Sequence, residues 1–383
     1  MIDKAMSVTQ LTEELIRIDS ATPPGDVGGV VQIIRQFSSL NGAAIELQEV
    51  EQGKENCIVT FDFGPGKTLL LNSHMDVNNP SGQQWSFNPL QPFQKDGKLY
   101  GLGSCDTKGS LAAMLIAVQR VIDNPVNVRG RLLFTTVMGE EAGGIGAFHM
   151  VQKGIAADGA VVGEPTGLEI CTAHKGTYIR RFVFKGKAAH SANSHRGINA
   201  IHHAARFAAS YSELQTALDQ HPHPILGPAN ASVTLIGGGT RQNAIPESCF
   251  VVCDRRLIPA EDSHKADREV AAILERLTRD LPELNCKTVE VLASTVPSQT
   301  ATDQEIVQVA LKAASEVRGI ESQPQGFNAG CDMSKFVTVA HIPTVICGPG
   351  SLQQAHTPDE FVEIEQLHQA VAVYERIIRG FLR

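Results

Sequence analysis

The spacing of apolar residues divides the first part of the chain into alternating helical and extended segments. Apolar positions recur every three to four residues at 8–18, 27–41, 108–122 and about 143–153, which is typical of helices. Short continuous apolar runs lie between them at 56–62, 68–73, 131–138 and 158–162, as expected for strands buried on both faces. This alternation predicts an α/β fold with a central, mostly parallel sheet and flanking helices.

The pattern changes after about residue 176. Strand-like segments occur at 177–186, 230–238, 246–257 and 286–294, and helical segments occur at 197–214 and 262–281. Their order, β-α-β-β-α-β, is that of a ferredoxin-like unit. From about residue 296 the earlier alternation returns, with helices near 302–317, 331–339 and 362–381 and a strand at 343–347. We therefore predict one α/β domain over 1–176 and 296–383, interrupted by an inserted domain over 177–295.

The composition is that of an ordinary globular protein. The 383 residues are 42% hydrophobic and 19% charged, which leaves enough apolar material for two cores. A net charge of −8, without a basic stripe, argues against nucleic acid as the main partner. The longest nearly apolar stretch, 110–122, is too short to span a bilayer and contains Arg120, so we expect no membrane association.

The eight cysteines are scattered along the chain without a C-x-x-C pair. Because the N-terminal segment also lacks the apolar core of a signal peptide, we expect reduced thiols in a cytoplasmic protein. Cys249 and Cys253 could suggest a metal-binding pair, but they lie within a predicted strand, which disfavours a thiolate site.

Histidine and acidic residues follow the predicted strands of the α/β domain. In an open α/β sheet, the loops after the carboxyl ends of the strands meet at one edge, where ligands bind. Seven such side chains stand in these loops or before the helix at 108–122: His74, Asp76, Asp106, Glu140, Glu141, Glu164 and His356. Taken singly, each has an ordinary structural explanation, since Asp106 could cap the following helix and Glu164 could form a turn. Their convergence on one edge indicates a site for zinc or a similar divalent cation.

The number of these side chains exceeds what a single metal ion needs. A catalytic zinc ion takes three protein ligands and keeps one open position, whereas this set suffices for two ions with one shared carboxylate. Two metal ions about 3.5–4 Å apart can activate a water molecule and stabilise a hydrolytic transition state. A protease with a single zinc ion would show H-E-x-x-H on a helix, and the sequence contains no such motif.

Glu140 and Glu141 are adjacent in the segment TTVMGEEAGGIGA, residues 135–147. Two neighbouring carboxylates repel each other, so nearby cations would explain the pair. Because successive side chains of a strand point to opposite sides, we expect Glu141 to bind a metal ion and Glu140 to face the reacting water as general base.

Eight motifs resemble, in type and order, those of the acetylornithine deacetylase, succinyl-diaminopimelate desuccinylase, aminoacylase and glutamate carboxypeptidase family of two-metal peptidases. They are SHMDV, YGLGSCDTKG, GEEAGG, VVGEPT, AHKG, GKAAHSANSHRGINA, GGTRQNAIPESC and GPGSLQQAHTPDEF, and they extend from about residue 70 to residue 362. Each motif alone would be weak evidence, but the ordered set is highly specific. It looks closest to the acetylornithine deacetylase branch.

The resemblance implies two divalent metal ions, with zinc expected and cobalt or manganese as alternatives. One ion would be held by three side chains, His74, Asp106 and Glu164. The other would be held by Asp106, Glu141 and His356, so that Asp106 bridges the two ions. Asp76 would orient His74 through its far ring nitrogen, and Glu140 would be the general base.

The resemblance also identifies the inserted domain as a lid that commonly pairs with a second copy of the chain, which implies a homodimer. His190 would donate a hydrogen bond to the oxyanion, often across that dimer. Asn243 and Arg256 match lid positions that contact the carbonyl or carboxylate of the substrate. Structural explanations stay open, because Asn243 could form a turn and Arg256 could be a surface charge, with Arg255 an equal rival for the ligand role.

For function, the resemblance implies a hydrolase that removes the acyl group from an N-acyl amino acid, in amino-acid metabolism such as arginine biosynthesis. Succinyl-diaminopimelate desuccinylase, carboxypeptidase and dipeptidase activities are alternatives that would take a related small molecule or a short peptide. Asp332 stands where acetylornithine deacetylases usually have a Thr-Glu-Ala segment, which leaves the acyl group and amino acid open.

Other classes of protein fit the sequence less well. A catalytically inactive binding relative is the non-enzymatic alternative, but the intact set of ligands and base argues against it. A nucleotide-dependent dehydrogenase is disfavoured because GLGSCD and GPGSLQ lack the third glycine of the dinucleotide fingerprint. A serine hydrolase is disfavoured because the sequence has no G-x-S-x-G motif.

Overall fold

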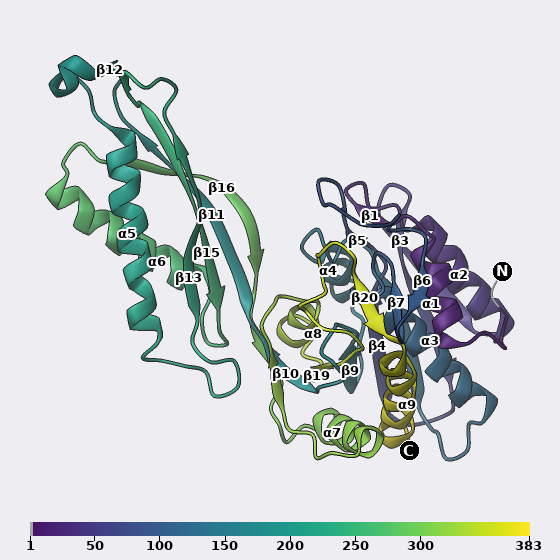
Figure 1. Cartoon of the computed structure of the whole chain (residues 1–383). Helices are drawn as coiled ribbons and strands as arrows, with labels where there is room; N and C mark the ends of the chain where they lie inside the picture. The colour runs from purple at the N-terminus through teal and green to yellow at the C-terminus, as the bar shows by residue number, and fades with distance from the viewer. Residues whose placement is uncertain (1–2) are drawn as a thin grey trace. The chain divides into compact units, whose positions relative to one another are not determined.

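The computed structural model describes residues 3–383 and shows two compact units (Figure 1). The first unit contains the chain up to Thr172 together with Gln299–Phe327 and Cys331–Arg383. The second unit is Ala173–Ser298 with Asn328–Gly330. The sequence pattern suggested boundaries after residues 176 and 295.

A mixed sheet forms the centre of the first unit. In spatial order its strands are β17 Ser298–Gln299, β10 Cys171–His174, β19 Thr344–Ile346, β9 Gly159–Val162, β4 Thr68–His74, β8 Arg131–Val137, β3 Lys54–Asp62 and β2 Ala44–Glu51, with β18 Gln325–Phe327 pairing with β10. The four strands β19, β9, β4 and β8 are parallel, as predicted. Strand β10 is antiparallel to β19, and β3 is antiparallel to β8. Strand β2 is antiparallel to β3, because a short turn joins the two and reverses the chain.

Strand β2 was not predicted from the sequence. Its residues alternate between exposed and half-buried positions, because it lies at the edge of the sheet and contributes little to the core. By contrast, all seven residues of β4 are buried, since this strand lies in the middle of the sheet. The central strands therefore produce the continuous apolar runs that the sequence shows.

Helices flank this sheet. They are α1 Val8–Ile16, α2 Gly28–Leu40, α3 Lys108–Asp123, α4 Ile145–Gln152, α7 Glu305–Arg318, α8 Met333–Thr338 and α9 Ile364–Phe381. Helix α3 packs against α1 and α9, and α9 also packs against α7. Side chains such as Leu71, Phe134, Ala113 and Tyr374 join strands and helices in one buried core. This core fixes the ends of the central strands.

Short strands outside the main sheet complete the first unit. Such elements of two or three residues carry no readable period, so the sequence did not predict them. They are β1 Ala21–Thr22 paired with β5 Val77–Asn78, and a three-stranded sheet of β6 Phe93–Lys95, β7 Lys98–Tyr100 and β20 Phe361–Glu363.

The second unit has the predicted ferredoxin-like topology. Its strands β11 Gly176–Lys185, β13 Asn230–Gly238, β15 Ser248–Leu257 and β16 Asn285–Thr295 form an antiparallel sheet in the order β13-β15-β11-β16. The helices α5 Ala200–Leu218 and α6 Ser263–Asp280 cover one face of this sheet (Figure 1). Asp262 caps α6 by accepting a hydrogen bond from the Lys265 backbone N–H.

The core of the second unit lies between this sheet and the two helices. The rings of Phe182 and Phe184 both pack against Phe207 with centroids 5.2 Å apart. Cys249 and Cys253 belong to the same buried cluster, and burial raises the pKa of Cys253 to about 12. Both therefore belong to the core as neutral thiols, which agrees with the sequence argument against a thiolate site.

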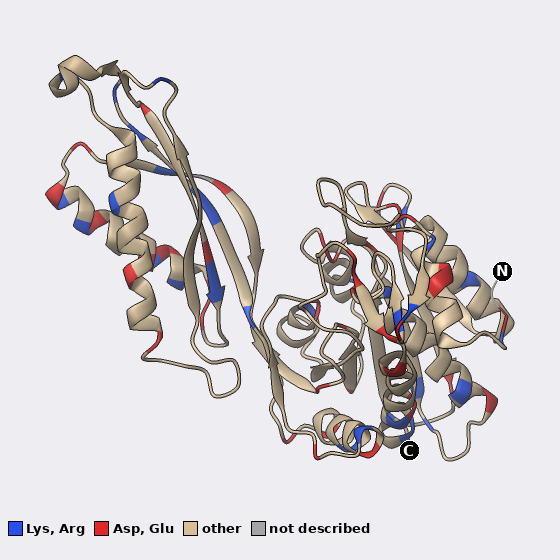
Figure 2. Cartoon of the chain, viewed as in Figure 1, with Lys and Arg blue, Asp and Glu red and all other residues tan. Residues whose placement is uncertain are grey.

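Beyond the main strands, the second unit ends in a small appendage formed by β12 Ala189–His190, the 3-10 helix Ser191–Arg196 and β14 Ala244–Ile245. Acidic and basic side chains are interspersed along both units (Figure 2). Within residues 3–383, none of the helices combines the length and the apolar character that a membrane span requires.

Candidate metal centre

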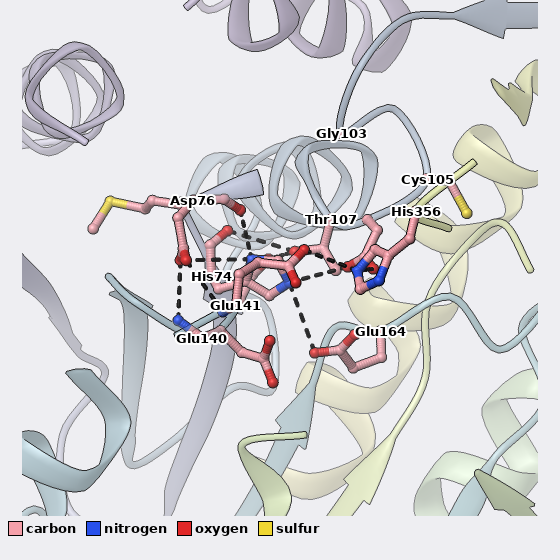
Figure 3. Close-up of polar contacts among 12 residues, drawn as sticks. His74, Asp76, Gly103, Cys105, Thr107, Glu140, Glu141, Glu164 and His356 are labelled. Carbon is pink, nitrogen blue, oxygen red and sulfur yellow. Dashed lines mark hydrogen bonds and ion pairs between the residues drawn. The ribbon is translucent and has the colours of Figure 1, made fainter. Parts of the chain in front are cut away.

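Three buried side chains meet at the carboxyl ends of β4 and β9. His74 is the last residue of β4, Glu164 follows β9, and Asp106 precedes α3. The His74 Nε2 atom lies 3.1 Å from Asp106 Oδ1 and 3.9 Å from Glu164 Oε1 (Figure 3). One nitrogen and two carboxylate oxygens, all within 4.8 Å of one another, form a group that could hold a metal ion.

A second group shares Asp106 with the first. His356 Nε2 lies 3.3 Å from Asp106 Oδ2 and 3.1 Å from Glu141 Oε1. These ligand atoms also lie within 4.8 Å of one another. Asp106 thus offers one carboxylate oxygen to each group, which is the arrangement of a bridging ligand. The structure brings together all five side chains that the sequence suggested as metal ligands.

Asp106 does not cap the helix that follows it. The residue before α3 is Thr107, and no side chain accepts a hydrogen bond from the first turn of this helix. The carboxylate of Asp106 instead contacts His74 and His356. The capping explanation considered for Asp106 is therefore wrong, and its carboxylate stays available to the site.

Asp76 supports the site through two different atoms. Its backbone carbonyl oxygen lies 2.8 Å from His74 Nδ1, whereas its nearest carboxylate oxygen is 3.9 Å away. Because a carbonyl only accepts, Nδ1 carries a proton, and Nε2 faces Asp106. Asp76 thus contacts this far ring nitrogen through its main chain and not through its side chain.

The carboxylate of Asp76 holds the turn that carries the two adjacent acids. Its Oδ1 accepts from the Glu140 backbone N–H and its Oδ2 from that of Glu141, each at 3.1 Å. The Thr22 hydroxyl also donates to Oδ2 at 3.2 Å. These contacts connect β4 with the turn after β8 and fix where that turn lies.

Glu140 and Glu141 do not lie on a strand, so the alternation argument for their separate directions is wrong. Strand β8 ends at Val137, and Gly139 turns the chain with φ +69°. The backbone N–H groups of Gly143 and Gly144 close the turn on the Glu140 carbonyl oxygen. This turn directs Glu141 into the second ligand group, while Glu140 lies outside both groups (Figure 3).

The electrostatics of the site call for positive charge. Burial alone would raise the pKa of Asp106, but hydrogen bonds from His356 and His74 hold that pKa well below its usual range. Burial, reinforced by neighbouring carboxylates, raises the pKa of Glu164 well above its usual value and that of Glu140 to about 8. So many buried acceptors in one place are destabilising unless protons or cations compensate them.

The donor set fits a divalent cation. If His74 is neutral and its proton is on Nδ1, then Nε2 is an acceptor that lies 3.1 Å from another acceptor, Asp106 Oδ1. Only a proton or a cation between the two atoms removes this repulsion. Contacts with Asp106 and Glu141 likewise raise the pKa of His356 to about 11. Imidazole and carboxylate ligands in groups of three are those that zinc and related ions take.

A small cavity adjoins the second group. It is lined by Asp106, Glu141 and His356 together with Trp85 and Leu102. Trp85 is the only tryptophan in the sequence, so tryptophan fluorescence reports on the surroundings of this residue, which include the cavity.

Sequence reasoning gave no role to Glu360, which lies beside this centre. Its carboxylate is buried and accepts hydrogen bonds from the backbone N–H groups of Gly103, Cys105 and Asp106 at 2.8–3.0 Å. Glu360 lies within the motif GPGSLQQAHTPDEF, but its partners are main-chain amides. Since almost every residue type has a main-chain N–H group, the sequence alone does not show which residues bond to Glu360.

Asp332, which departs from the expected pattern, lies immediately before α8 and is buried. Its Oδ1 lies 3.5 Å from Lys335 Nζ, and both atoms would collide with a side chain at Gly144. The negative charge of Asp332 raises the pKa of Glu140 further, after burial and against the opposing effect of His74. Asp332 therefore lies near the turn that carries the adjacent acids.

The three lid residues suggested by the sequence, His190, Asn243 and Arg256, lie in two separate parts of the second unit. His190 pairs with Ala244 in the ladder between β12 and β14, next to the exposed Asn243. Arg256 lies near the other end of β15, opposite Thr177 at the start of β11. The eight residue-to-residue steps from Ser248 to Arg256 extend about 26 Å at roughly 3.3 Å per step. The unit thus brings His190 and Asn243 together but not Arg256.

Arg255 and Arg256 differ in their surroundings. Arg255 is 1% exposed and forms ion pairs with Glu261 at 2.9 Å and Glu269 at 3.2 Å. The side chain of Arg256 is 33% exposed and bonds to Asp254 and Thr177. Arg255 is therefore committed to the interior of the unit, whereas Arg256 has a face open to solvent.

Comparison with known proteins shows the family of this chain. The sequence model of Peptidase family M20/M25/M40 matches residues 70–380, which is most of the chain. The chain belongs to peptidase family M20/M25/M40. The resemblance drawn from the motifs is confirmed, and so is the class of enzyme, a metallo-amidohydrolase.

Relatives of the M20 chain extend over nearly its whole length. It is 30% identical to an acetylornithine deacetylase of Myxococcus xanthus, covering 98% of this chain and 95% of the relative. It is 26% identical to a probable succinyl-diaminopimelate desuccinylase of Staphylococcus epidermidis, covering 92% and 93%. Both names occur among relatives at similar distances, so the comparison does not choose between the two substrates.

Solved structures of this M20 fold agree with the α/β unit and its inserted second unit. A tripeptidase from Staphylococcus aureus has a TM-score of 0.83 at 23% identity, covering 99% of this chain and 98% of that chain. A dinuclear metal binding peptidase of the M20 family from Bacillus subtilis has a TM-score of 0.72 at 17% identity, covering 98% and 97%. At such identities the likeness concerns the fold.

Replacing His356 tests the second ligand group. We expect His356→Ala to lower the metal content of protein reconstituted with Zn²⁺, because the variant leaves only Asp106 and Glu141 in that group. Elemental analysis after dialysis measures the metal per chain. The control is His368→Ala, which alters an exposed histidine on α9. Equal metal content in both variants would contradict the assignment.

Proposed function

We propose that this enzyme removes the acyl group from N-acyl amino acids, as an acetylornithine deacetylase does. The observation that carries the proposal is the pair of ligand groups joined by Asp106, with Glu140 beside them but outside both. Family membership and relatives named acetylornithine deacetylase over more than nine-tenths of the chain support the reaction class.

Two divalent metal ions, zinc in the first place and cobalt or manganese as alternatives, are the proposed cofactors. One would bind His74, Asp106 and Glu164. The other would bind Asp106, Glu141 and His356. Bound at these positions, such ions would supply Lewis acidity, which polarises the amide carbonyl and makes a water molecule more acidic.

Glu140 is the proposed general base. It stands next to the ligand Glu141 on a turn held by Asp76, so its distance from the centre is set by the main chain. In this role its carboxylate takes a proton from the attacking water and passes it to the nitrogen of the leaving amine. Asp76 acts by positioning, through His74 on one side and the turn of adjacent acids on the other.

The lid residues are proposed to act in a homodimer. His190 would donate a hydrogen bond to the oxyanion, while Asn243 and Arg256 would bind the carbonyl or carboxylate of the substrate. His190 pairs with β14, just before the start of β15, whereas Arg256 lies near the end of β15, about 26 Å further along. This distance is too large for both side chains to reach one small molecule from the same lid. A second copy that contributes His190 and Asn243 removes this difficulty.

A desuccinylase or a dipeptidase is the second candidate, and Asp332 favours it. The Gly-x-Asp arrangement at 330–332 departs from the Thr-Glu-Ala segment usual in acetylornithine deacetylases. A relative named as a probable succinyl-diaminopimelate desuccinylase, 26% identical to this chain, also supports this candidate. These reactions use the same centre and differ in the acyl group or amino acid that the lid accepts.

We also propose that the enzyme works in the cytoplasm. All eight cysteines are free, and seven of them are buried. A protein with this many unpaired thiols suits a reducing compartment.

Glutamine variants of the two adjacent acids separate their roles. We expect Glu140→Gln to lower kcat by about 10²–10⁴-fold with metal content unchanged, because it removes a base but no ligand. Glu141→Gln is expected to lower the metal content as well, since it weakens the second ligand group. Kinetics and elemental analysis on the same samples give both quantities. Near-normal turnover in Glu140→Gln would show that another group is the base.

A substrate panel tests the proposed reaction. We expect hydrolysis of at least one compound among N-acetyl-, N-succinyl- and N-formyl-amino acids and dipeptides, assayed with Zn²⁺, Co²⁺ or Mn²⁺. Preference for N-acetyl compounds supports the deacetylase, and preference for N-succinyl compounds or dipeptides supports the second candidate. If none of these amides is cleaved, an inactive binding relative becomes the better explanation.

Mixed dimers test whether the lid acts across two copies. His190→Ala and Glu140→Gln are each expected to be nearly inactive alone. After the two are unfolded and refolded together, or co-expressed, about a quarter of the native activity should return, because half of the dimers are mixed and each has one intact centre. Mixtures that stay inactive, or a monomer seen by light scattering, would contradict the shared site.

A further inference from the structure

Two loops of the first unit meet beside the candidate metal centre. The Asp106 loop is residues 101–107, and the His356 loop is residues 350–360. The backbone N–H of Gly101 donates to the carbonyl oxygen of Glu360 at 3.0 Å. The thiol of Cys105 donates to the carbonyl oxygen of Ser351 at 3.3 Å. Each loop carries one ligand of the second group, Asp106 on one and His356 on the other.

The side chain of Glu360 makes the densest contact between these loops. Its Oε2 accepts from the Gly103 backbone N–H at 2.9 Å. Its Oε1 accepts from the backbone N–H groups of Cys105 at 2.8 Å and Asp106 at 3.0 Å. Three amides of one short loop thus converge on a carboxylate that is 3% exposed. Figure 3 labels Gly103 and Cys105 on this loop, with Cys105 near His356.

Burying the carboxylate of Glu360 has a cost in folding free energy, so its presence is not explained by stability alone. Removing an ionised carboxylate from water is compensated only when its oxygens are well bonded, and an apolar side chain of similar volume is often as stable. What an apolar side chain cannot do is hold three backbone amides at fixed positions. The contact therefore gives the Asp106 loop a defined geometry that packing alone would not supply.

We propose that Glu360 is a positioning residue that sets the spacing between Asp106 and His356 and thereby retains the second metal ion. The proposal rests on the proposed two-metal function. His356 stands four residues before Glu360, so one side chain ties the segment of one ligand to the amide of the other. The first group shares Asp106, but His74 at the end of β4 and Glu164 after β9 make no contact with Glu360 among the hydrogen bonds of the described chain. The loss of Glu360 should thus affect the second ion more than the first.

Glu360→Gln is the variant that tests this. It keeps the shape of the side chain and one acceptor oxygen, which can still serve Cys105 and Asp106. Its amide group would face the Gly103 N–H, donor against donor, so the loop must shift. The matched control is Glu363→Gln, three residues further on, where the side chain is 43% exposed and pairs with Lys98 at 3.6 Å.

The experiment is a Co²⁺ titration of metal-free full-length protein. Trp85 fluorescence follows the second ion, because Trp85 lines the cavity beside Asp106, Glu141 and His356. Elemental analysis at each step counts the ions bound. We expect two ions per chain in the unaltered protein and in Glu363→Gln. In Glu360→Gln the second ion should bind about 10–100-fold more weakly, the usual effect of losing a group that supports a ligand. The first ion should lose less affinity, because it shares Asp106 but keeps His74 and Glu164.

Several outcomes overturn the proposal. One is binding of both ions by Glu360→Gln with unaltered affinities. Another is equal weakening of both ions, together with a lowered unfolding temperature in the metal-free state, which would mean that Glu360 stabilises the fold in general. If Glu360→Gln does not fold, Glu360→Asp keeps the charge one methylene shorter and must show the same selective loss. Absence of metal binding by the unaltered protein would instead refute the two-metal function itself.

Discussion

The structure depends on a carboxylate that two imidazoles contact at once. Asp106 is buried, yet contacts with His74 and His356 favour its ionised form against the effect of burial. Because each of its oxygens belongs to a different ligand group, displacement of this one side chain alters both groups. The surrounding loops can be understood by how they keep Asp106 and its partners in place.

Two further carboxylates, those of Asp76 and Glu360, keep the candidate ligands in place by accepting hydrogen bonds from main-chain N–H groups. Asp76 accepts the amides of Glu140 and Glu141, and Glu360 accepts amides of the Asp106 loop. In both cases an acid that does not belong to a ligand group holds the backbone next to one that does. Such support makes the spacing of the ligands independent of the rotamers of long, flexible side chains.

The fold and the grouping of the candidate ligands could be predicted because both leave signals in residue identity. Strands β4, β8 and β9 are buried apolar runs, and parallel strands bring their carboxyl ends to the same edge. That reasoning sufficed to bring His74, Glu141 and Glu164 together. Edge strand β2 escaped prediction because only one of its faces meets the core.

Features that depend on backbone conformation were harder to predict from the sequence. The directions of Glu140 and Glu141 come from a turn opened by Gly139, not from strand alternation. Glu360 bonds to amides that any residue would present. The distance between His190 and Arg256 follows from strand register, which required the pairing of β11 with β15. These features depend on which main-chain atoms meet, and residue identity does not record that.

The most direct test of a shared Asp106 is electron paramagnetic resonance of the protein reconstituted with Mn²⁺. Two ions bridged by one carboxylate should couple magnetically, so the account predicts two Mn²⁺ per chain with the spectrum of a coupled pair, lost in Asp106→Asn. Two uncoupled six-line spectra, a single Mn²⁺ per chain, or a coupled spectrum that survives in Asp106→Asn would contradict it.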